Sequence, residues 1–181
     1  SGTGPKAGGP LYLSRFRKVD ALQSDGAFDA DMVTNVLTAA IKSESRVATV
    51  SKDILPGPTG ELNQLSRHAR APILCMGPGV QAATAQKEAV VALGGRAILA
   101  QGVITPQTLI EIDGISGVLF WGDVASKRAY GQALAKRDGA ILPLLSRMPN
   151  ASYVLEEQHL CVDTTAAGGN AALLAESAPD A

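Results

Sequence analysis

Short apolar runs alternate with helix-like segments between residues 71 and 145, and this alternation is the clearest pattern in the chain. The apolar runs, each expected to form a strand, are residues 73–76, 97–100, 118–121 and 140–142. The segments between them, each expected to form a helix, are residues 80–93, 105–112 and 123–136. Strands that alternate with helices form parallel βαβ units, and strands without polar alternation are covered on both faces. The pattern therefore predicts an α/β domain built on a doubly wound, Rossmann-like parallel sheet.

The predicted helices carry recognisable start signals. Thr105 followed by Pro106 combines a capping residue with proline at the first helical position. Asp123 is expected to cap the third helix. Pro143 should place the last strand at an edge of the sheet or end it early, because proline has no N–H to donate. The apolar face of the helix predicted at residues 80–93 is expected to consist of Ala82, Ala85, Ala89 and Leu93.

The flanking regions are less regular. Residues 11–16 are expected to form a short strand or extended piece, and residues 54–61, with two prolines and two glycines, to break regular structure. Residues 153–156 and 159–164 are expected to be two extended arms, which either pair as a hairpin or lie on another chain. Residues 29–44 are predicted to form a helix capped by its first residue, because apolar residues recur along one face at Met32, Val33, Val36, Leu37, Ala40 and Ile41.

Composition adds bounds on partners and location. Hydrophobic residues make up 46% of the 181 residues, which supports a sizeable core, whereas charged residues make up only 18%, against about a quarter in ordinary globular domains. The low charge indicates a surface partly covered by a partner or by the rest of a longer chain. The formal net charge of −1, without a basic stripe, argues against nucleic-acid binding. No apolar run approaches the roughly 20 residues that cross a bilayer, and two cysteines in apolar runs fit a reduced, cytoplasmic interior.

A glycine-rich turn follows the first strand of the alternating region. Gly77, Gly79 and Ala82 give the spacing G-x-G-x-x-A between a strand and a helix, which is the context of dinucleotide-binding turns. Against that function, Pro78 removes one backbone N–H that would face phosphate, and no acidic residue follows the second strand to hold a ribose. A tight turn that needs glycine for its backbone is favoured, and a nucleotide (NAD)-binding module is the alternative.

Other candidate groups also have structural explanations. Cys75 and Cys161 are candidate nucleophiles, with His68 or His159 as the base. Cys75 lies inside a predicted central strand, and Cys161 lies two residues from His159 on an extended arm. Neither thiol has an evident electropositive pocket or oxyanion hole, so buried or incidental thiols are favoured over an independent thiol enzyme. Three aspartates lack the ligand count of a calcium loop and are expected to flank a helix N-terminus, namely Asp25, Asp29 and Asp31. We expect no metal site.

Three segments of the chain, residues 1–13, 55–63 and 163–171, together resemble sequences of the bacterial proline utilization A family. Residues 1–13 (SGTGPKAGGPLYL) look like the closing glycine-rich loop of its glutamate-semialdehyde (pyrroline-5-carboxylate) dehydrogenase module. Residues 55–63 (LPGPTGELN) resemble a stretch that follows that module, and residues 163–171 (DTTAAGGNA) resemble the motif at the extreme C-terminus. The segments occur in the expected order over nearly the whole chain. Together with a loop-like start that lacks an initiator methionine, they predict the C-terminal region of a long member of this family.

The resemblance implies a bifunctional parent enzyme, which oxidises proline with FAD and then oxidises the resulting semialdehyde to glutamate with NAD. Its last domain is similar to the Rossmann domain of aldehyde dehydrogenases, is not catalytic, and covers the tunnel between the two active sites. The family thus implies no catalytic residue and no cofactor in this fragment, with FAD and NAD bound upstream. The implied partners are the upstream modules and, for the full-length protein, further copies of itself. A DNA-binding domain or peripheral membrane contact would belong only to the parent.

The resemblance also divides the chain. Residues 1–20 would close the upstream aldehyde dehydrogenase module, residues 21–150 would form the Rossmann-like domain, and residues 151–181 would form a β-flap arm followed by a tail that docks at the tunnel. Ser1 and Gly2 would belong to the loop that holds the substrate carboxylate in the parent. The tunnel-docking tail would comprise Thr164, Thr165, Ala166, Ala167, Gly168, Gly169 and Asn170.

Several positions depart from the family pattern. Gln158 and His159 stand where arginine and threonine are expected, and Leu62 stands where arginine is common. Cys161 replaces the usual serine and Asp163 the usual asparagine. The last change matters most, because a carboxylate only accepts hydrogen bonds where an amide also donates them. The docking of the tail is therefore expected to differ in detail.

Overall fold

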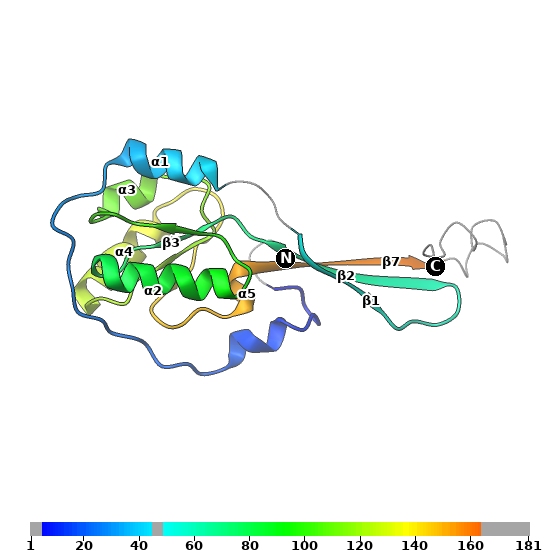
Figure 1. Ribbon diagram of the computed structural model, residues 1–181. Coiled ribbons are helices and arrows are strands. Elements are labelled where there is room, and N and C mark those ends of the chain that lie inside the picture. Colours follow the sequence, from blue (N-terminus) through cyan, green and yellow to red (C-terminus); the bar gives the residue numbers. More distant parts are fainter. Residues whose placement is uncertain (1–4, 45–48, 164–181) are drawn as a thin grey trace.

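The structure is a computed structural model that describes residues 5–44 and 49–163. It divides into a body, which holds a parallel sheet and its helices, and an antiparallel arm that projects from the body (Figure 1). The helices are the 3-10 helix η1 (Tyr12–Phe16) and the α-helices α1 (Thr34–Ser43), α2 (Gly79–Ala92), α3 (Pro106–Glu111), α4 (Val124–Ala135) and α5 (Ala151–Val154). The strands are β1 (Thr49–Leu55), β2 (Glu61–Ala69), β3 (Ile73–Cys75), β4 (Ala97–Leu99), β5 (Gly117–Leu119), β6 (Leu144–Leu145) and β7 (Leu155–Asp163).

The body contains a four-stranded parallel sheet in the order β4-β3-β5-β6. Leu74 of β3 lies opposite Ile98 of β4 on one side and opposite Val118 of β5 on the other. The connections from β3 to β4 and from β4 to β5 therefore run in opposite directions, which creates a switch point between β3 and β5. The predicted α/β class with a parallel sheet is confirmed, and the strand next to Pro143 lies at an edge as expected.

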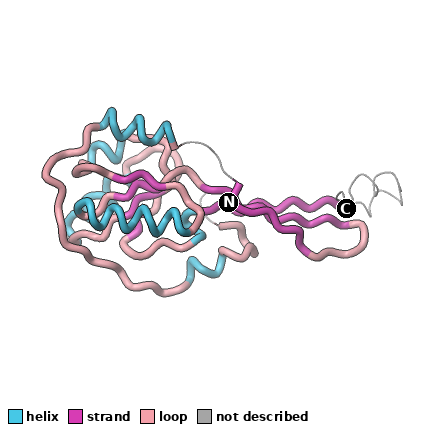
Figure 2. Tube along the Cα trace, viewed as in Figure 1, coloured by secondary structure: helices cyan, strands magenta, loops and turns pink. Residues whose placement is uncertain are grey.

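Helices lie on both sides of the parallel sheet (Figure 2). Each face of the sheet packs into its own hydrophobic cluster. On one face, helices α1, α3 and α4 pack against strand residues such as Leu74 and Val118. On the other face, helices α2 and α5 pack against residues such as Cys75 and Leu119. Because successive strand residues point to opposite faces, adjacent residues of one strand enter different clusters. This explains why the strand sequences show no polar alternation.

The arm is a separate antiparallel sheet in the order β1-β2-β7. β2 is its central strand and pairs with β7 from Ala69 opposite Leu155, next to the body, to Glu61 opposite Asp163 at the tip. Leu155 at the base is buried, whereas β1 and most of β7 are exposed. The arm therefore combines a buried base with a shaft whose side chains are accessible along both edge strands.

The helix predicted from Asp29 begins five residues later, at Thr34. The preceding backbone is extended, because the Met32 N–H donates to the Val103 carbonyl and the Val103 N–H donates to the Ala30 carbonyl, each at 2.9 Å. A backbone held in this way does not also form the first helical turn. Within the predicted apolar stripe, the buried residues are Leu37 and Ile41.

Two predicted strands are wrong in type or position. Residues 11–16 contain the helix η1 in place of an extended piece. The last strand of the body, β6, follows Pro143 and does not include residues 140–142. Ile141 is 83% exposed, so this apolar run does not enter the sheet.

The arm differs most from expectation. Residues 54–61 were expected to break regular structure, and residues 56–60 do so, but they connect two strands that were not predicted, β1 and β2. Residues 153–164 were expected to contain two pieces that pair with each other or lie on another chain. α5 ends at Val154, and the following residues form one continuous strand, β7, that pairs with β2.

Candidate functional site

The glycine-rich turn joins β3 to α2 at the switch point of the sheet. Gly77 and Gly79 have φ angles of +86° and +67°, in the left-handed region that favours glycine. A Cβ atom on Gly77 would lie 2.6 Å from the backbone nitrogen of Gly79, so the turn folds tightly onto itself. Both glycines are therefore explained by the backbone of the turn, and Ala82 is buried in the first turns of α2.

The polar groups of the first glycine are bonded within the chain. The fully buried side chain of Gln86 accepts a hydrogen bond from the Gly77 N–H at 3.0 Å and donates one to the Gly77 carbonyl at 2.8 Å. The same carbonyl also accepts from the Trp121 N–H at 2.8 Å. In dinucleotide-binding turns, backbone N–H groups at the helix start face the phosphates. Here one such N–H is already used by a glutamine of α2.

An extended stretch, residues 22–32, crosses the carboxyl ends of the parallel strands, and we call it the covering segment. The Ser24 N–H donates to the Trp121 carbonyl at 2.8 Å, just beyond β5. A Cβ atom on Gly79 would lie 3.0 Å from the backbone nitrogen and oxygen of Ala27, so the segment also touches the start of α2. In Figure 1 this blue stretch passes around the end of the body before it enters α1.

The position of the covering segment matters because ligands of open parallel sheets bind outside the carboxyl ends of the strands, at the switch point. That place lies between β3 and β5 in this fold. Contacts of Ala27 with Gly79 and of Ser24 with Trp121 put the chain's own backbone there. A dinucleotide would have to displace the covering segment before its phosphates reached the turn.

Neither thiol has the environment of a nucleophile. Cys75 is buried in the central strand, and burial raises its pKa to about 12. Cys161 is exposed on β7, where its Sγ donates to Glu61 Oε1 at 3.2 Å. That hydrogen bond is the main cause that raises the pKa of Cys161, and the nearby charges of Glu61 and Asp163 raise it further. Raised pKa values leave little reactive thiolate at neutral pH.

The aspartates near residue 30 lie in the covering segment and not at a helix start. Asp25, Asp29 and Asp31 are all exposed, and Asp31 forms an isolated bridge with Val103. The expectation that they flank a helix N-terminus is therefore wrong. Over residues 5–44 and 49–163, no group of three histidine, cysteine or acidic side chains is placed to hold a metal ion. None of the helices in these ranges is both long and apolar enough to cross a membrane.

The base of the arm carries a charged cluster that sequence reasoning missed. The Glu157 side chain is fully buried, and its Oε1 lies 3.7 Å from Arg67 Nε. Arg67 also pairs with Asp53 of β1, with 3.0 Å between Nη1 and Oδ2. Glu157 Oε2 accepts from the Leu11 N–H at 3.4 Å, so the segment before η1 is tied to the base of the arm. The sequence carries no local signal for this cluster, because buried Glu157 and exposed Glu156 are adjacent residues of the same type.

Two groups of predicted residues are not tested by this geometry. Ser1 and Gly2 lie outside the described residues, and so does the tail Thr164, Thr165, Ala166, Ala167, Gly168, Gly169 and Asn170. The strand that precedes the tail is described as far as Asp163, whose place is opposite Glu61 at the arm tip. Two of the segments quoted for the family resemblance, residues 55–63 and the start of 163–171, therefore meet at this tip.

Comparison with known proteins finds relatives of one kind. No family model matches the chain. Over 96% of its length the chain is 31% identical to the bifunctional protein PutA of Escherichia coli (strain K12), and over 97% it is 32% identical to that of Rhizobium meliloti. The chain is homologous to a part of PutA. It spans 17% of the Escherichia coli protein and 18% of the Rhizobium meliloti protein, and the alignment of 224 residues with the former is longer than this chain.

Solved structures of PutA give a weaker likeness. A crystal structure of bifunctional proline utilization A (PutA) aligns with a TM-score of 0.41 and 24% identity. It covers 52% of this chain, and this chain covers 13% of it. A mutant of the Bradyrhizobium japonicum PutA gives the same TM-score and coverage at 25% identity.

Proposed function

We propose that this chain is the non-catalytic C-terminal domain of a PutA-type enzyme that converts proline to glutamate through pyrroline-5-carboxylate. In this proposal the body is a Rossmann-like domain of the aldehyde dehydrogenase superfamily that binds no cofactor. FAD and NAD are bound by upstream modules of the same cytoplasmic polypeptide. The domain covers the tunnel that carries the intermediate and supports contacts between modules and between subunits.

The observation that carries the proposal is the covering segment. A dinucleotide needs an open crevice and free N–H groups at the switch point. Ala27 lies against Gly79 in that crevice, and Gln86 takes the Gly77 N–H. A domain whose ligand crevice is filled by its own chain is not expected to bind a cofactor there. Its function is then expected to lie on its other surfaces.

The arm supports the second half of the proposal. Its base is held in the core, through Leu155 and Glu157, and its tip brings together two segments that resemble the parent family. The chain continues past Asp163 from this tip, so the arm determines where the predicted docking tail begins. A cover over a tunnel would act by exclusion, because keeping a reactive intermediate out of bulk water raises its effective concentration at the second active site.

The decisive experiment is made in the full-length parent enzyme. Removing the residues after Asp163 is expected to leave each half-reaction largely intact and to introduce a lag before glutamate forms in the coupled reaction. The matched control is Arg128→Gln, which removes an exposed charge on α4 away from the arm. A coupled time course without a lag in the truncated enzyme would contradict the tunnel-covering function.

The alternative, a nucleotide-binding module, has its own test. NAD and NADH are titrated into the 181-residue chain, and amide NMR signals are followed residue by residue. The proposal expects no saturable shifts in the signals of residues 77–82. Saturable shifts centred on Gly77, Gly79 and Ala82 would show that the covering segment yields to a cofactor, and would favour the alternative.

A further inference from the structure

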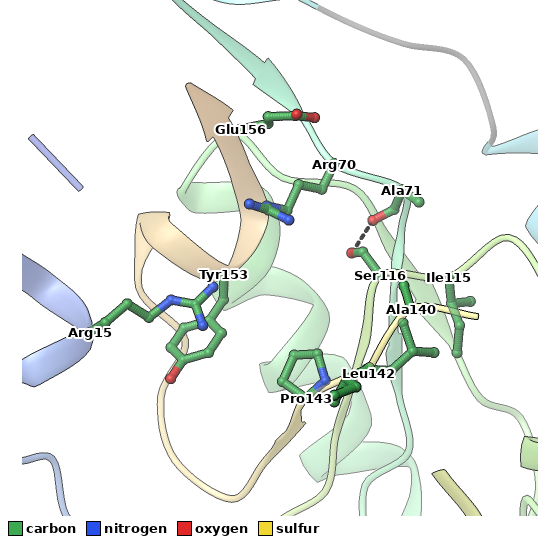
Figure 3. Close-up of a pocket in the computed structure, with 11 residues that line it drawn as sticks. Arg15, Arg70, Ala71, Ile115, Ser116, Ala140, Leu142, Pro143, Tyr153 and Glu156 are labelled. Carbon is green, nitrogen blue, oxygen red and sulfur yellow. Dashed lines mark hydrogen bonds between the residues drawn. The ribbon is translucent and has the colours of Figure 1, made fainter. Parts of the chain in front are cut away.

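A pocket of about 240 Å³ lies on the body near the base of the arm, away from the glycine-rich turn. It is bounded by Arg15 of η1, Arg70 just after β2, and the ring of Tyr153 in α5 (Figure 3). Its other walls come from the residues around Ser116 and Pro143. Elements far apart in the sequence thus place two guanidinium groups at one cavity.

Two arginines lie over a single aromatic ring at this place. The guanidinium carbon of Arg15 lies 3.8 Å from the centroid of the Tyr153 ring, and that of Arg147 lies 5.7 Å from it. Arg15 donates to the hydroxyl and the carbonyl of Ser152, at 2.9 and 2.8 Å. Arg147 donates to the Tyr153 hydroxyl at 2.6 Å. These partners fix the orientation of both guanidinium groups but are uncharged, so they do not neutralise them.

The positive charges at the pocket act on one another. The pKa of Arg15 is lowered, first by burial and further by the charges of Arg70 and Arg147, while Tyr153 opposes the shift. The pocket also holds one acid, Glu156, whose side chain is exposed at the rim and extends away from the Arg15 guanidinium in Figure 3. The arginines outnumber this acid, so an anion that entered the pocket would meet a net positive environment in partly desolvated surroundings.

The opposite wall is aliphatic. Ile115, Leu142 and Pro143 line it, and the Ser116 hydroxyl donates to the Ala71 carbonyl. Guanidinium groups bind both carboxylates and phosphates. An apolar wall facing the arginines favours an anion that carries a hydrocarbon body, since an inorganic phosphate has none to bury.

We propose that this pocket binds a small organic carboxylate, whose charged group is held by Arg15 and Arg70 and whose aliphatic part packs against Leu142 and Pro143. This site goes beyond the proposed tunnel-covering function and does not depend on it. Because Arg15 belongs to η1 and Arg70 to the body, such a ligand would also link the segment before residue 20 to the rest of the domain.

The test uses the 181-residue chain and four probes that separate charge from hydrocarbon: butyrate, glutarate, butyramide and inorganic phosphate. Amide NMR titrations are expected to show saturable shifts around Arg70, Ser116 and Tyr153 with the two carboxylates. Butyramide, which lacks the charge, should give none, and phosphate should bind at least tenfold more weakly. Absence of saturable shifts with both carboxylates would overturn the proposal, and equal binding of phosphate would overturn its choice of a carboxylate.

Variants decide whether the binding is local. Arg70→Gln is expected to weaken carboxylate binding at least tenfold, but Arg70 also donates to the Leu155 carbonyl, so this variant is checked for folding. Ala140→Glu places a carboxylate at the exposed rim without touching the core and should weaken binding to a similar extent. Arg128→Gln, which removes the same charge elsewhere, should leave binding unchanged. Equal weakening by Arg128→Gln, or full binding by Ala140→Glu, would overturn the site.

Discussion

The carboxyl edge of the parallel sheet and the arm differ in exposure. Another segment of the chain covers the sheet edge, whereas β1 and most of β7, the edge strands of the arm, are exposed. At the sheet edge, the covering segment and Gln86 bond to the turn that ligand-binding proteins of this architecture leave open. At the arm, both edge strands carry exposed apolar side chains, such as Ile54 and Leu160. The comparison indicates that the sheet edge is filled by the chain itself, whereas the arm keeps apolar side chains exposed to whatever surrounds it.

The largest expected effect is a difference in unfolding free energy between a substitution in the parallel sheet and one in the arm. Leu119→Ala removes a fully buried side chain from the central sheet and should lower the free energy of unfolding by about 2–5 kcal/mol. Leu160→Ala on the arm, where the side chain is 51% exposed, should cost less than about 1 kcal/mol. Urea denaturation of both variants checks this. Equal losses would mean that the arm is part of the cooperative core.

The second effect comes from removing the Gln86 side chain that bonds the backbone of the glycine-rich turn. Gln86→Leu leaves the Gly77 N–H without its side-chain partner in a buried place, which should cost about 1–3 kcal/mol in unfolding free energy. Gln81→Leu changes an exposed position on the same helix and is the matched control. Thermal unfolding measures stability, and hydrogen exchange at Gly77 measures the local bond. A stable Gln86→Leu variant with a protected Gly77 amide would contradict the assigned role of the glutamine.

The join between the regions gives a smaller effect. Glu157→Gln removes the buried charge that faces Arg67 while keeping an acceptor for the Leu11 N–H. We expect a loss of about 1–3 kcal/mol, near the lower end, because Arg67 keeps its bond to Asp53. Glu156→Gln, one residue away and exposed, is the control. If the two variants unfold alike in urea, the cluster does not stabilise the arm base.

The smallest effect concerns the arm tip and its pH dependence. The hydrogen bond to Glu61 raises the pKa of Cys161, so the thiol stays protonated to higher pH than an ordinary cysteine. At pH 8 iodoacetamide should therefore label Cys161 more slowly than a free cysteine, at a rate that rises with pH. Glu61→Gln should speed the labelling a few-fold by lowering that pKa. Buried Cys75, with a pKa of about 12, should label only on unfolding.

Much of the body could be predicted from local signals. Thr105 accepts from the Thr108 N–H and Asp123 from the Ser126 N–H, so both predicted helix caps are confirmed. Wholly apolar runs located β3, β4 and β5 because both faces of this sheet are buried. The predicted start of α1 was wrong because hydrogen bonds to the backbone of Val103, which lies far away in the sequence, override local helix preference.

The strands of the arm, and the burial of Gln86 beside the glycine-rich turn, were harder to predict from the sequence. β1 and β2 are polar strands that exist through pairing with each other and with β7, and pairing between distant segments leaves no local pattern. The expected apolar face of α2 included Ala85, which is exposed, whereas the buried face includes Gln86. A glutamine among alanines looks like a surface residue, although its spacing of four from Ala82 and from Val90 places it on the buried face.

The pairing of β2 with β7 transmits position over distance. Nine successive residue pairs run from Ala69–Leu155 to Glu61–Asp163, which corresponds to about 30 Å of strand. Leu155 is anchored in the hydrophobic cluster beside α2, and a shift of one residue would turn it and every other β7 side chain to the opposite face. The register of the β2–β7 pairing is therefore set where Leu155 packs in the core. The same packing fixes the position of Asp163 at the arm tip, at the other end of the nine residue pairs.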